Sequence, residues 1–271
     1  GRTQNVKQSL RDCDRSFLGS SPILARAPGD LHERMQRNRA LASSMVARAI
    51  TNVSARPCER FREPRQGGGR MRRRRYSCSV CGRISLAKPE EAIAAVEASW
   101  LGATPPQPRF SIFPTQTSLV VVVGDGGRLA RMARWGLVPS WAQDPAIGAK
   151  MINARSETVA EKPAFRNLIG RRRCIVLTDG FFEWEDRRTH KVPYRVHAPS
   201  SGPLLMAGLW DTWRSPEGAE PLDSFAILTC EPRPDLTWLH DRMPVILPQP
   251  AALRWLDTAG VSKEDALALA Q

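Results

Sequence analysis

The sequence changes character at Val80-Cys81-Gly82-Arg83, and this change limits what each side of it can fold into. Residues 1–79 carry 18 Lys and Arg against 6 Asp and Glu, show no sustained hydrophobic periodicity and end in a Pro/Gly/Arg-rich stretch. Such a composition cannot bury enough apolar surface to offset the entropy lost on ordering. We therefore expect residues 1–79 to be a disordered, Arg-rich extension and residues 80–271 to be the folded domain.

The basic character of the chain belongs almost wholly to this extension. Of the net charge of +13, residues 80–271 contribute only 22 Lys and Arg against 21 Asp and Glu. A nucleic-acid site in the folded part therefore has to rest on particular arginines. The six cysteines show no dense disulfide spacing, and no apolar run reaches the roughly 18–20 residues that span a bilayer. We expect a cytoplasmic protein without membrane contact.

Downstream of Cys81 the pattern predicts short strands joined by Gly and Pro turns, with helices at the edges. A helix is predicted over Pro89–Trp100, because Pro stands at its start and two glutamates follow in its first turn. Two more helices are predicted near the C-terminus. The predicted strands are extended segments within 110–123, 129–137, 173–177, 181–185, 194–197, 204–210 and 225–229. The fold class expected is α+β, a single domain with a curved, barrel-like mixed or antiparallel sheet and peripheral helices.

Four reactive side chains stand in tight local sequence: Cys81, Asn153, Glu183 and His240. A thiol, a carboxamide, a carboxylate and an imidazole are the groups that covalent catalysis with acid–base assistance uses. Glu183 lies between Phe182 and Trp184, where apolar neighbours would raise its pKa by desolvation. Sequence spacing alone cannot show that these groups meet.

Each of these residues also has a structural interpretation. A Cys before Gly is often a buried small hydrophobe, a Glu beside Trp is often a solvated rim residue, and His240 could satisfy a backbone carbonyl. Cys78 and Cys81 have the spacing of half a zinc site, but no second pair follows. We expect no metal and no cofactor.

Taken together and in order, the motifs of residues 80–257 resemble the SOS-response-associated peptidase (SRAP) family, the abasic-site processing proteins. The motifs that carry the resemblance are Cys81-Gly82-Arg83, Phe113-Pro114-Thr115-Gln116, Arg134-Trp135-Gly136-Leu137-Val138-Pro139-Ser140-Trp141, Asn153-Ala154-Arg155-Ser156-Glu157-Thr158, Asp179-Gly180-Phe181-Phe182-Glu183-Trp184, Ala207-Gly208-Leu209-Trp210 and His240-Asp241-Arg242-Met243-Pro244-Val245.

The resemblance implies an enzyme of DNA repair that crosslinks itself to abasic sites in single-stranded DNA. In the family, the cysteine follows the initiator Met and becomes the N-terminal residue, so that Cys81 would use its α-amine and its thiol to close a thiazolidine on the sugar aldehyde. By the same resemblance, Asn153 orients the cysteine and the sugar, Glu183 donates and accepts protons, and His240 assists sugar opening and crosslink reversal. A peptidase (autoprocessing) activity and a lyase-type activity are implied as well.

The resemblance also implies the DNA contacts. Arg83 and Arg155 would bind phosphates beside the lesion, since a guanidinium suits bidentate phosphate binding. Trp135 and Trp141 could stack on bases, or could equally belong to the core. The expected partner is single-stranded DNA containing abasic sites, and the expected state is a monomer that associates with the bacterial nucleoid on damage.

The sequence departs from the family pattern in three places. Phe182 replaces a common Tyr, and Thr229-Cys230-Glu231-Pro232 replaces an expected Thr/Ala-rich strand end. The extension matters most, because an internal Cys81 has an amide nitrogen, which is not nucleophilic. Three explanations stay open: a wrongly assigned start, since Val80 is what an internal GTG start codon would encode; processing before Cys81; or a genuine extension.

Two other functions are compatible with the sequence. One is a cysteine peptidase that uses Cys81 and His240 with Asn153 or Glu183, for which an internal cysteine is no handicap. The other is a non-catalytic, basic single-stranded-DNA-binding protein in which the extension makes the contacts, with steep salt dependence and no preference for lesions.

Overall fold

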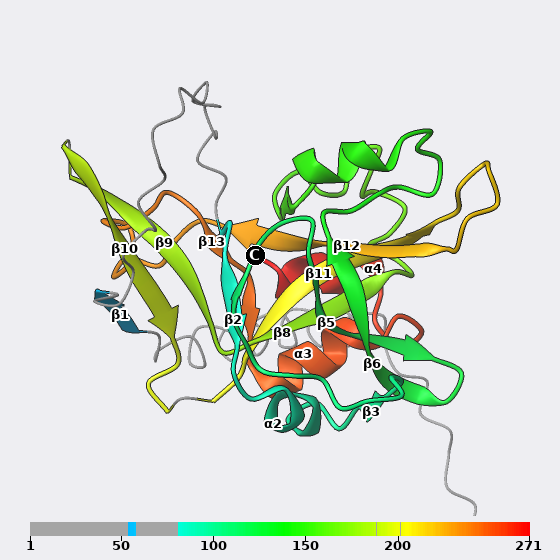
Figure 1. The fold of residues 1–271 in the computed structure, drawn as a ribbon, viewed down its shortest axis with the longest axis horizontal. Helices are drawn as coiled ribbons and strands as arrows, with labels where there is room; N and C mark the ends of the chain where they lie inside the picture. Colours follow the sequence, from blue (N-terminus) through cyan, green and yellow to red (C-terminus); the bar gives the residue numbers. More distant parts are fainter. Residues whose placement is uncertain (1–53, 58–80, 188, 201) are drawn as a thin grey trace, which may run out of the picture. The chain divides into compact units, whose positions relative to one another are not determined.

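The structure is a computed structural model that describes residues 54–57, 81–187, 189–200 and 202–271 (Figure 1). These residues all belong to one compact unit, Arg39–Gln271. The disorder predicted for residues 1–79 lies outside the described residues, except that Ser54–Pro57 form a short strand, β1.

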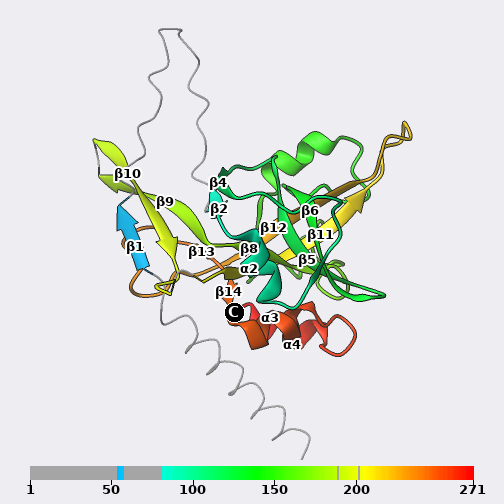
Figure 2. The same ribbon diagram turned by 60° about the horizontal axis from the view of Figure 1, so that its bottom comes forward.

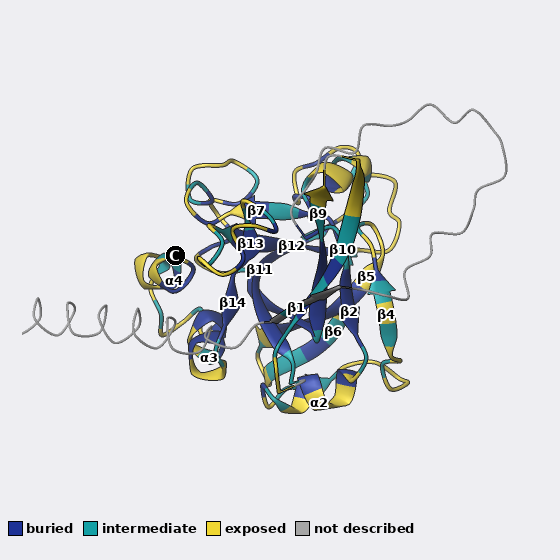
Figure 3. Cartoon of the chain, turned by 90° about the vertical axis from the view of Figure 1, so that its left-hand side faces the viewer, coloured by how far each residue is buried: buried dark blue, intermediate teal, exposed yellow. Residues whose placement is uncertain are grey.

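A closed barrel of five strands forms the centre of the described domain. Its strands are β5 (Thr117–Gly124), β6 (Gly127–Trp135), β8 (Arg173–Thr178), β11 (Leu204–Trp213) and β12 (Leu222–Cys230). The order β12-β11-β8-β5-β6 runs antiparallel, and a parallel pairing of β6 with β12 closes the ring. Figure 3 shows the mainly buried strands arranged around this ring. The barrel-like α+β fold expected from the sequence is confirmed.

The barrel closes because its interior positions are filled by matched side chains. Trp135 and Phe225, which are register partners on β6 and β12, stack with ring centroids 6.4 Å apart. Gly208 on β11 is required by space, since a Cβ there would lie 2.9 Å from the Cys174 sulfur and 3.0 Å from the Ala226 carbonyl oxygen. The large pair and the glycine are both accommodated by close packing.

A second sheet lies beside the barrel in the order β1-β10-β9-β2-β4 (Figure 2). Its strands downstream of β1 are β2 (Ile84–Leu86), β4 (Arg109–Ile112), β9 (Gly180–Arg187) and β10 (His190–His197). Strands β8 and β9 are separated by Asp179 alone, so the chain passes directly from the barrel into this sheet. Glu183, on β9, therefore belongs to the second sheet and lies close in sequence to the barrel strand β8.

Short elements complete the domain. They are β3 (Ser99–Trp100), β7 (Asn153–Arg155), β13 (Met243–Pro244), β14 (Ile246–Leu247), the 3₁₀ helix η2 (Pro145–Lys150) and the helices α2 (Pro89–Ala94), α3 (Gln249–Leu256) and α4 (Lys263–Leu269). The buried guanidinium of Arg173 joins the C-terminal helices to the barrel, because it donates to the carbonyl oxygens of Trp255 at 2.5 Å and Asp257 at 2.6 Å.

The helix predicted over Pro89–Trp100 is wrong at its C-terminal end. Helix α2 stops at Ala94, and Glu97 takes a positive φ of 51°. Ser99–Trp100 then pairs with β6 in parallel, opposite Leu129 and Ala130. Tertiary pairing with the barrel edge therefore overrides the local helical pattern.

Candidate active site

The second sheet brings Cys81 next to Glu183, although 102 residues separate them. Strand β2 begins three residues after Cys81 and runs antiparallel to β9, with Ile84 opposite Phe181. The Phe182 backbone N–H donates to the Arg83 carbonyl oxygen at 2.9 Å, which extends this alignment beyond β2. At its end the backbone N–H of Cys81 donates to Oε1 of Glu183. The pairing of two sequence motifs is therefore a direct result of strand register.

A polar cluster at the start of β9 fixes this register. The Asp179 carboxylate accepts hydrogen bonds from Ser85 Oγ at 2.5 Å, from the Ala87 backbone N–H at 2.5 Å and from the Arg195 guanidinium at 2.8 Å. Arg195 is on β10, so one carboxylate joins β2, β9 and β10. Charge-assisted bonds of this kind are the stronger class of hydrogen bond. They hold β2, and with it Cys81, against β9.

Glu183 is a buried carboxyl with a perturbed proton affinity. Glu183 is only 5% exposed, and this burial raises the pKa of its carboxyl from 4.5 to about 7. The hydrogen bonds from the N–H groups of Cys81 and Trp184 oppose this shift, and the negative charge of Asp241 adds to it. The raised pKa predicted from the sequence is confirmed. A carboxyl that titrates near neutral pH suits a proton donor and acceptor.

Cys81 itself is completely buried and has a positive φ of 49°. Burial, and secondly the negative charge of Glu183, raise the pKa of its thiol well above the usual range. A thiol in such surroundings stays protonated at neutral pH and is a poor source of thiolate. In the 271-residue chain these surroundings therefore favour the thiol over the thiolate at Cys81.

Asn153 and Arg155 lie on β7, which pairs in parallel with β12 at its C-terminal end. Asn153 is half-buried and Arg155 is exposed. Together with the 60% exposed Trp141 they line a groove of about 450 Å³ that also includes Lys162. Three residues predicted to be functional thus share one concave surface.

Trp135 does not share this surface. It is fully buried, it stacks on Phe225, and its indole N–H donates to the Ile152 carbonyl oxygen at 3.0 Å. The structure therefore favours the core interpretation of Trp135, and the predicted base contact is wrong for it. Its neighbour in the motif, Trp141, is exposed.

His240 lies in the segment between β12 and β13. Its Nδ1 is 3.1 Å from the backbone nitrogen of Arg242 and 2.7 Å from Oδ1 of Asp241. Nδ1 either accepts from the Arg242 N–H or, when it carries a proton, donates to Asp241. Because Asp241 also raises the pKa of Glu183, the charge of this segment is felt at the buried carboxyl.

Arg83 contacts two aromatic rings. Its guanidinium carbon is 4.4 Å from the centroid of Phe113 and 4.9 Å from that of Trp184. Trp184 follows Glu183 directly, so this stack stands beside the buried carboxyl. These two cation–π contacts orient the planar group.

The sequence did not predict the ion pair of Arg242 with Glu157. The two guanidinium nitrogens lie 2.8 and 2.7 Å from the two carboxylate oxygens, and one of them also donates to the Thr229 carbonyl oxygen at 2.7 Å. This pair ties the motif that follows β7 to the motif that contains His240. Glu157 and Arg242 both belong to motifs that carry the family resemblance, and this was the only indication in the sequence that they matter.

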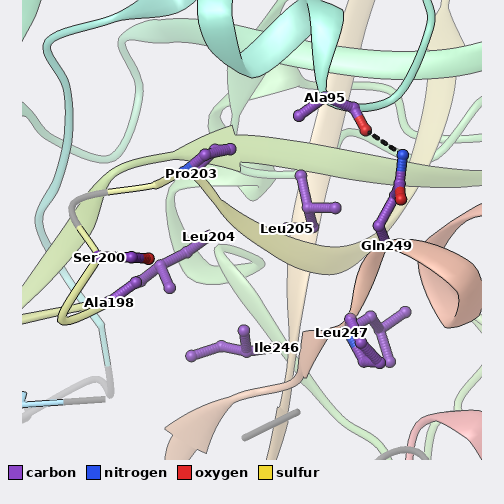
Figure 4. Close-up of a pocket in the computed structure, with 10 residues that line it drawn as sticks. Ala95, Ala198, Ser200, Pro203, Leu204, Leu205, Ile246, Leu247 and Gln249 are labelled. Carbon is purple, nitrogen blue, oxygen red and sulfur yellow. Dashed lines mark hydrogen bonds between the residues drawn. The ribbon is translucent and has the colours of Figure 1, made fainter. Parts of the chain in front are cut away.

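Other features of the described residues lie apart from this site. The pocket in Figure 4, about 470 Å³ in volume, is lined by residues such as Leu204, Ile246 and Gln249 and by none of the predicted site residues. Among the described residues, His, Cys, Asp and Glu form no group of three or more that could hold a metal ion. In the same part of the chain, no helix is long and apolar enough to cross a membrane.

Comparison with known proteins identifies relatives of this chain. The model of a family described as "SOS response associated peptidase (SRAP)" matches residues 80–271. The abasic site processing protein YoaM of Bacillus subtilis (strain 168) is 42% identical over 161 residues, which cover 58% of this chain and 70% of YoaM. The abasic site processing protein HMCES of Xenopus tropicalis is 38% identical over 164 residues, which cover 52% of this chain and 49% of HMCES.

Solved structures share the fold. A protein from Bacteroides thetaiotaomicron superposes with a TM-score of 0.63 at 26% identity, covering 70% of this chain and 86% of that protein. A protein from Bordetella bronchiseptica superposes with a TM-score of 0.60 at 27% identity, covering 70% of this chain and 93% of the other.

Proposed function

This chain belongs to the SOS response associated peptidase (SRAP) family, and from this premise we propose that it processes abasic sites in DNA by a covalent crosslink through Cys81. Its relatives YoaM and HMCES are abasic site processing proteins, which supports the substrate class. The substrate is single-stranded DNA in which one sugar has lost its base. Its open-ring form presents an aldehyde.

One observation carries the proposal: the nitrogen of Cys81 donates to the buried carboxyl of Glu183. In a chain that begins at Cys81 this nitrogen is an α-amine, which has an unperturbed pKa of roughly 7.7–8.0 and is partly neutral near pH 7. In the 271-residue chain, burial raises the pKa of the carboxyl that lies against this nitrogen to about 7, and a carboxyl in this place can exchange a proton with the α-amine. Nucleophile and acid–base group are thus already in contact.

The reaction follows from these two groups. The neutral amine adds to the aldehyde carbon. Protonated Glu183 gives its proton to the carbinolamine oxygen, which leaves as water, and the nitrogen then gives its remaining proton back to the Glu183 carboxylate. The thiol of Cys81 then adds across the resulting C=N bond, sulfur to carbon and hydrogen to nitrogen, and closes a five-membered thiazolidine. The thiol does not have to ionise first, which agrees with its raised pKa.

The remaining polar residues assist. Asn153, half-buried on β7, orients the cysteine and the sugar. His240 moves protons during sugar opening and crosslink reversal, and its Nδ1 has both a donor, the Arg242 N–H, and an acceptor, Asp241, within reach. Asp241, next to His240, also raises the pKa of Glu183 through its negative charge, so the segment of His240 is electrostatically coupled to the buried carboxyl.

The DNA strand contacts basic and aromatic side chains around these residues. Arg83, oriented by two rings, and Arg155, exposed on β7, bind flanking phosphates. Trp141 offers a stacking surface in the groove that it shares with Asn153 and Arg155. Trp135 has no part in DNA binding, because it is buried.

The proposal requires a free α-amine at Cys81. In the crosslinking form the catalytic domain, residues 80–271, therefore begins at Cys81. Residues 1–79 are removed or never made, and position 80 is lost with them or as the initiator Met. A cysteine peptidase would need a thiolate at Cys81. Burial and Glu183 both work against a thiolate, so the peptidase alternative lacks the support that the amine mechanism has.

The test compares the 271-residue chain with a chain that begins at Cys81 after Met removal. Each is mixed with single-stranded DNA bearing one abasic site and run on a denaturing gel, with undamaged DNA as the control. We expect a shifted band only for the shorter chain and only on damaged DNA. If neither chain shifts, the crosslinking proposal fails and peptide cleavage is tested next; a shift by the full chain would remove the need for an N-terminal cysteine.

A further inference from the structure

Trp238 is a large apolar side chain held out toward solvent by a well-anchored turn. It is 50% exposed, whereas Leu236 and Leu239 on either side are 5% and 6% exposed and belong to the core. Its indole N–H donates to the Asp235 carbonyl oxygen at 2.9 Å. The polar group of the side chain is therefore used within the turn, and what remains for a ligand is the apolar ring.

A second aromatic side chain supports this ring. Tyr194 on β10 meets Trp238 edge to face, with centroids 4.9 Å apart and an interplanar angle of 82°. Tyr194 is 7% exposed, and its hydroxyl donates to Glu185 at 3.1 Å. A ring braced by a buried, hydrogen-bonded partner loses little freedom when a ligand binds, which favours affinity.

The pair stands next to the reacting groups. Tyr194 is the register partner of Glu183, and directly opposed residues of antiparallel strands project from the same face. From Glu183, which holds the Cys81 nitrogen, the path to Trp238 crosses one strand spacing and one ring contact, on the order of 10 Å. Figures 1 and 2 both show the segment between β12 and β13 beside β9 and β10.

We propose that Trp238, braced by Tyr194, forms a subsite that stacks a nucleobase beside the abasic site. The abasic sugar has no base of its own, so an aromatic surface near it can only take the base of a flanking nucleotide. Stacking on a ring is tolerant of sequence, because every base has a π-face. The subsite rests on the proposed function for its substrate. It adds a base-stacking contact near Glu183, whereas Arg83 and Arg155 contact phosphates.

The test measures binding rather than crosslinking, so it uses the full 271-residue chain. One DNA strand carries a single tetrahydrofuran abasic analogue between normal nucleotides. A second strand has tetrahydrofuran at the neighbouring positions as well, so that it keeps every phosphate but lacks the flanking bases. Dissociation constants are measured by fluorescence anisotropy at a salt concentration that weakens the phosphate contacts. The variants are Trp238→Ala, Trp238→Phe and, as a matched exposed apolar control, Leu101→Ala.

We expect Trp238→Ala to weaken binding of the first strand by about 5- to 150-fold, the effect of removing a stacked aromatic residue. On the baseless strand it should have no effect, Trp238→Phe should restore most of the loss, and Leu101→Ala should be silent on both. Equal losses on both strands would mean that Trp238 only supports the turn, and no loss on either strand would mean that no base stacks there; each result overturns the proposal. Failure of the crosslinking gel with a base-dependent loss intact would instead refute the proposed reaction alone.

Discussion

Replacing the buried carboxyl by an isosteric amide, Glu183→Gln, should stabilise the fold at neutral pH while it abolishes crosslinking. The structure raises the pKa of Glu183 from 4.5 to about 7, so the folded state prefers the protonated form. The stability that this preference contributes is fully present below pH 4.5, is lost as the pH rises and is gone above pH 7. At 1.36 kcal/mol per pKa unit, the loss is about 3 kcal/mol.

The glutamine variant keeps an oxygen to accept the Cys81 N–H but carries no charge at any pH. Relative to the unchanged chain, it should therefore gain about 3 kcal/mol of unfolding free energy at pH 8 and about 1 kcal/mol at pH 5. Urea denaturation at both pH values measures the gain. Glu161→Gln, at an exposed position, is the control and should change stability by less than about 0.5 kcal/mol. A gain for Glu183→Gln that is the same at both pH values, or a loss at pH 8, would refute the reasoning.

Three further predictions concern the framework of the site. Asp179→Ala, which removes three hydrogen bonds of 2.5–2.8 Å, should cost about 2–4 kcal/mol of unfolding free energy and slow crosslinking, because β2 loses its anchor; unchanged chemical denaturation would contradict this. Gly136→Ala should cost at least about 3 kcal/mol, since φ is +121° and the new Cβ would lie 2.5 Å from the Gly148 carbonyl oxygen; thermal unfolding measures it, and a stable variant would refute the close approach. Trp135→Ala should lower the unfolding free energy by about 3–5 kcal/mol, because the side chain is fully buried. Trp141→Ala should change the unfolding free energy by less than about 0.5 kcal/mol and weaken single-stranded DNA binding about 5-fold or more. A large loss of stability for Trp141→Ala with none for Trp135→Ala would contradict this.

Much of the fold could be predicted because local patterns agree with it. Continuous apolar runs within the predicted segments 110–123 and 204–210 became the barrel strands β5 and β11. Gly124–Gly127 became the turn between β5 and β6. The closure of the barrel could not be predicted from such local patterns. It depends on a parallel pairing of β6 with β12, whose register partners Trp135 and Phe225 are far apart in the sequence.

The site shows the same division. The direction of the pKa shift of Glu183 could be predicted from its apolar sequence neighbours, but the predicted cause was incomplete. Phe182 and Trp184 are next to Glu183 on strand β9 and point to its opposite face, so the burial of the carboxyl depends on the packing of β9 in the fold. Contact between Cys81 and Glu183 could not, since it depends on how β2 aligns with β9. The two tryptophans of one motif, Trp135 and Trp141, have opposite exposures. Only the position of the first inside the barrel, against Phe225, explains the difference.

In the proposed thiazolidine, the nitrogen and the sulfur of Cys81 bond to the same sugar carbon. Intact mass spectrometry of the adduct between an abasic single strand and the chain that begins at Cys81, with and without borohydride, tests it most directly. A thiazolidine forms with loss of one water and has no C=N bond, so the adduct mass should be unchanged by borohydride. An adduct that gains two hydrogens on borohydride treatment would be an imine without the sulfur bond, and it would contradict the account.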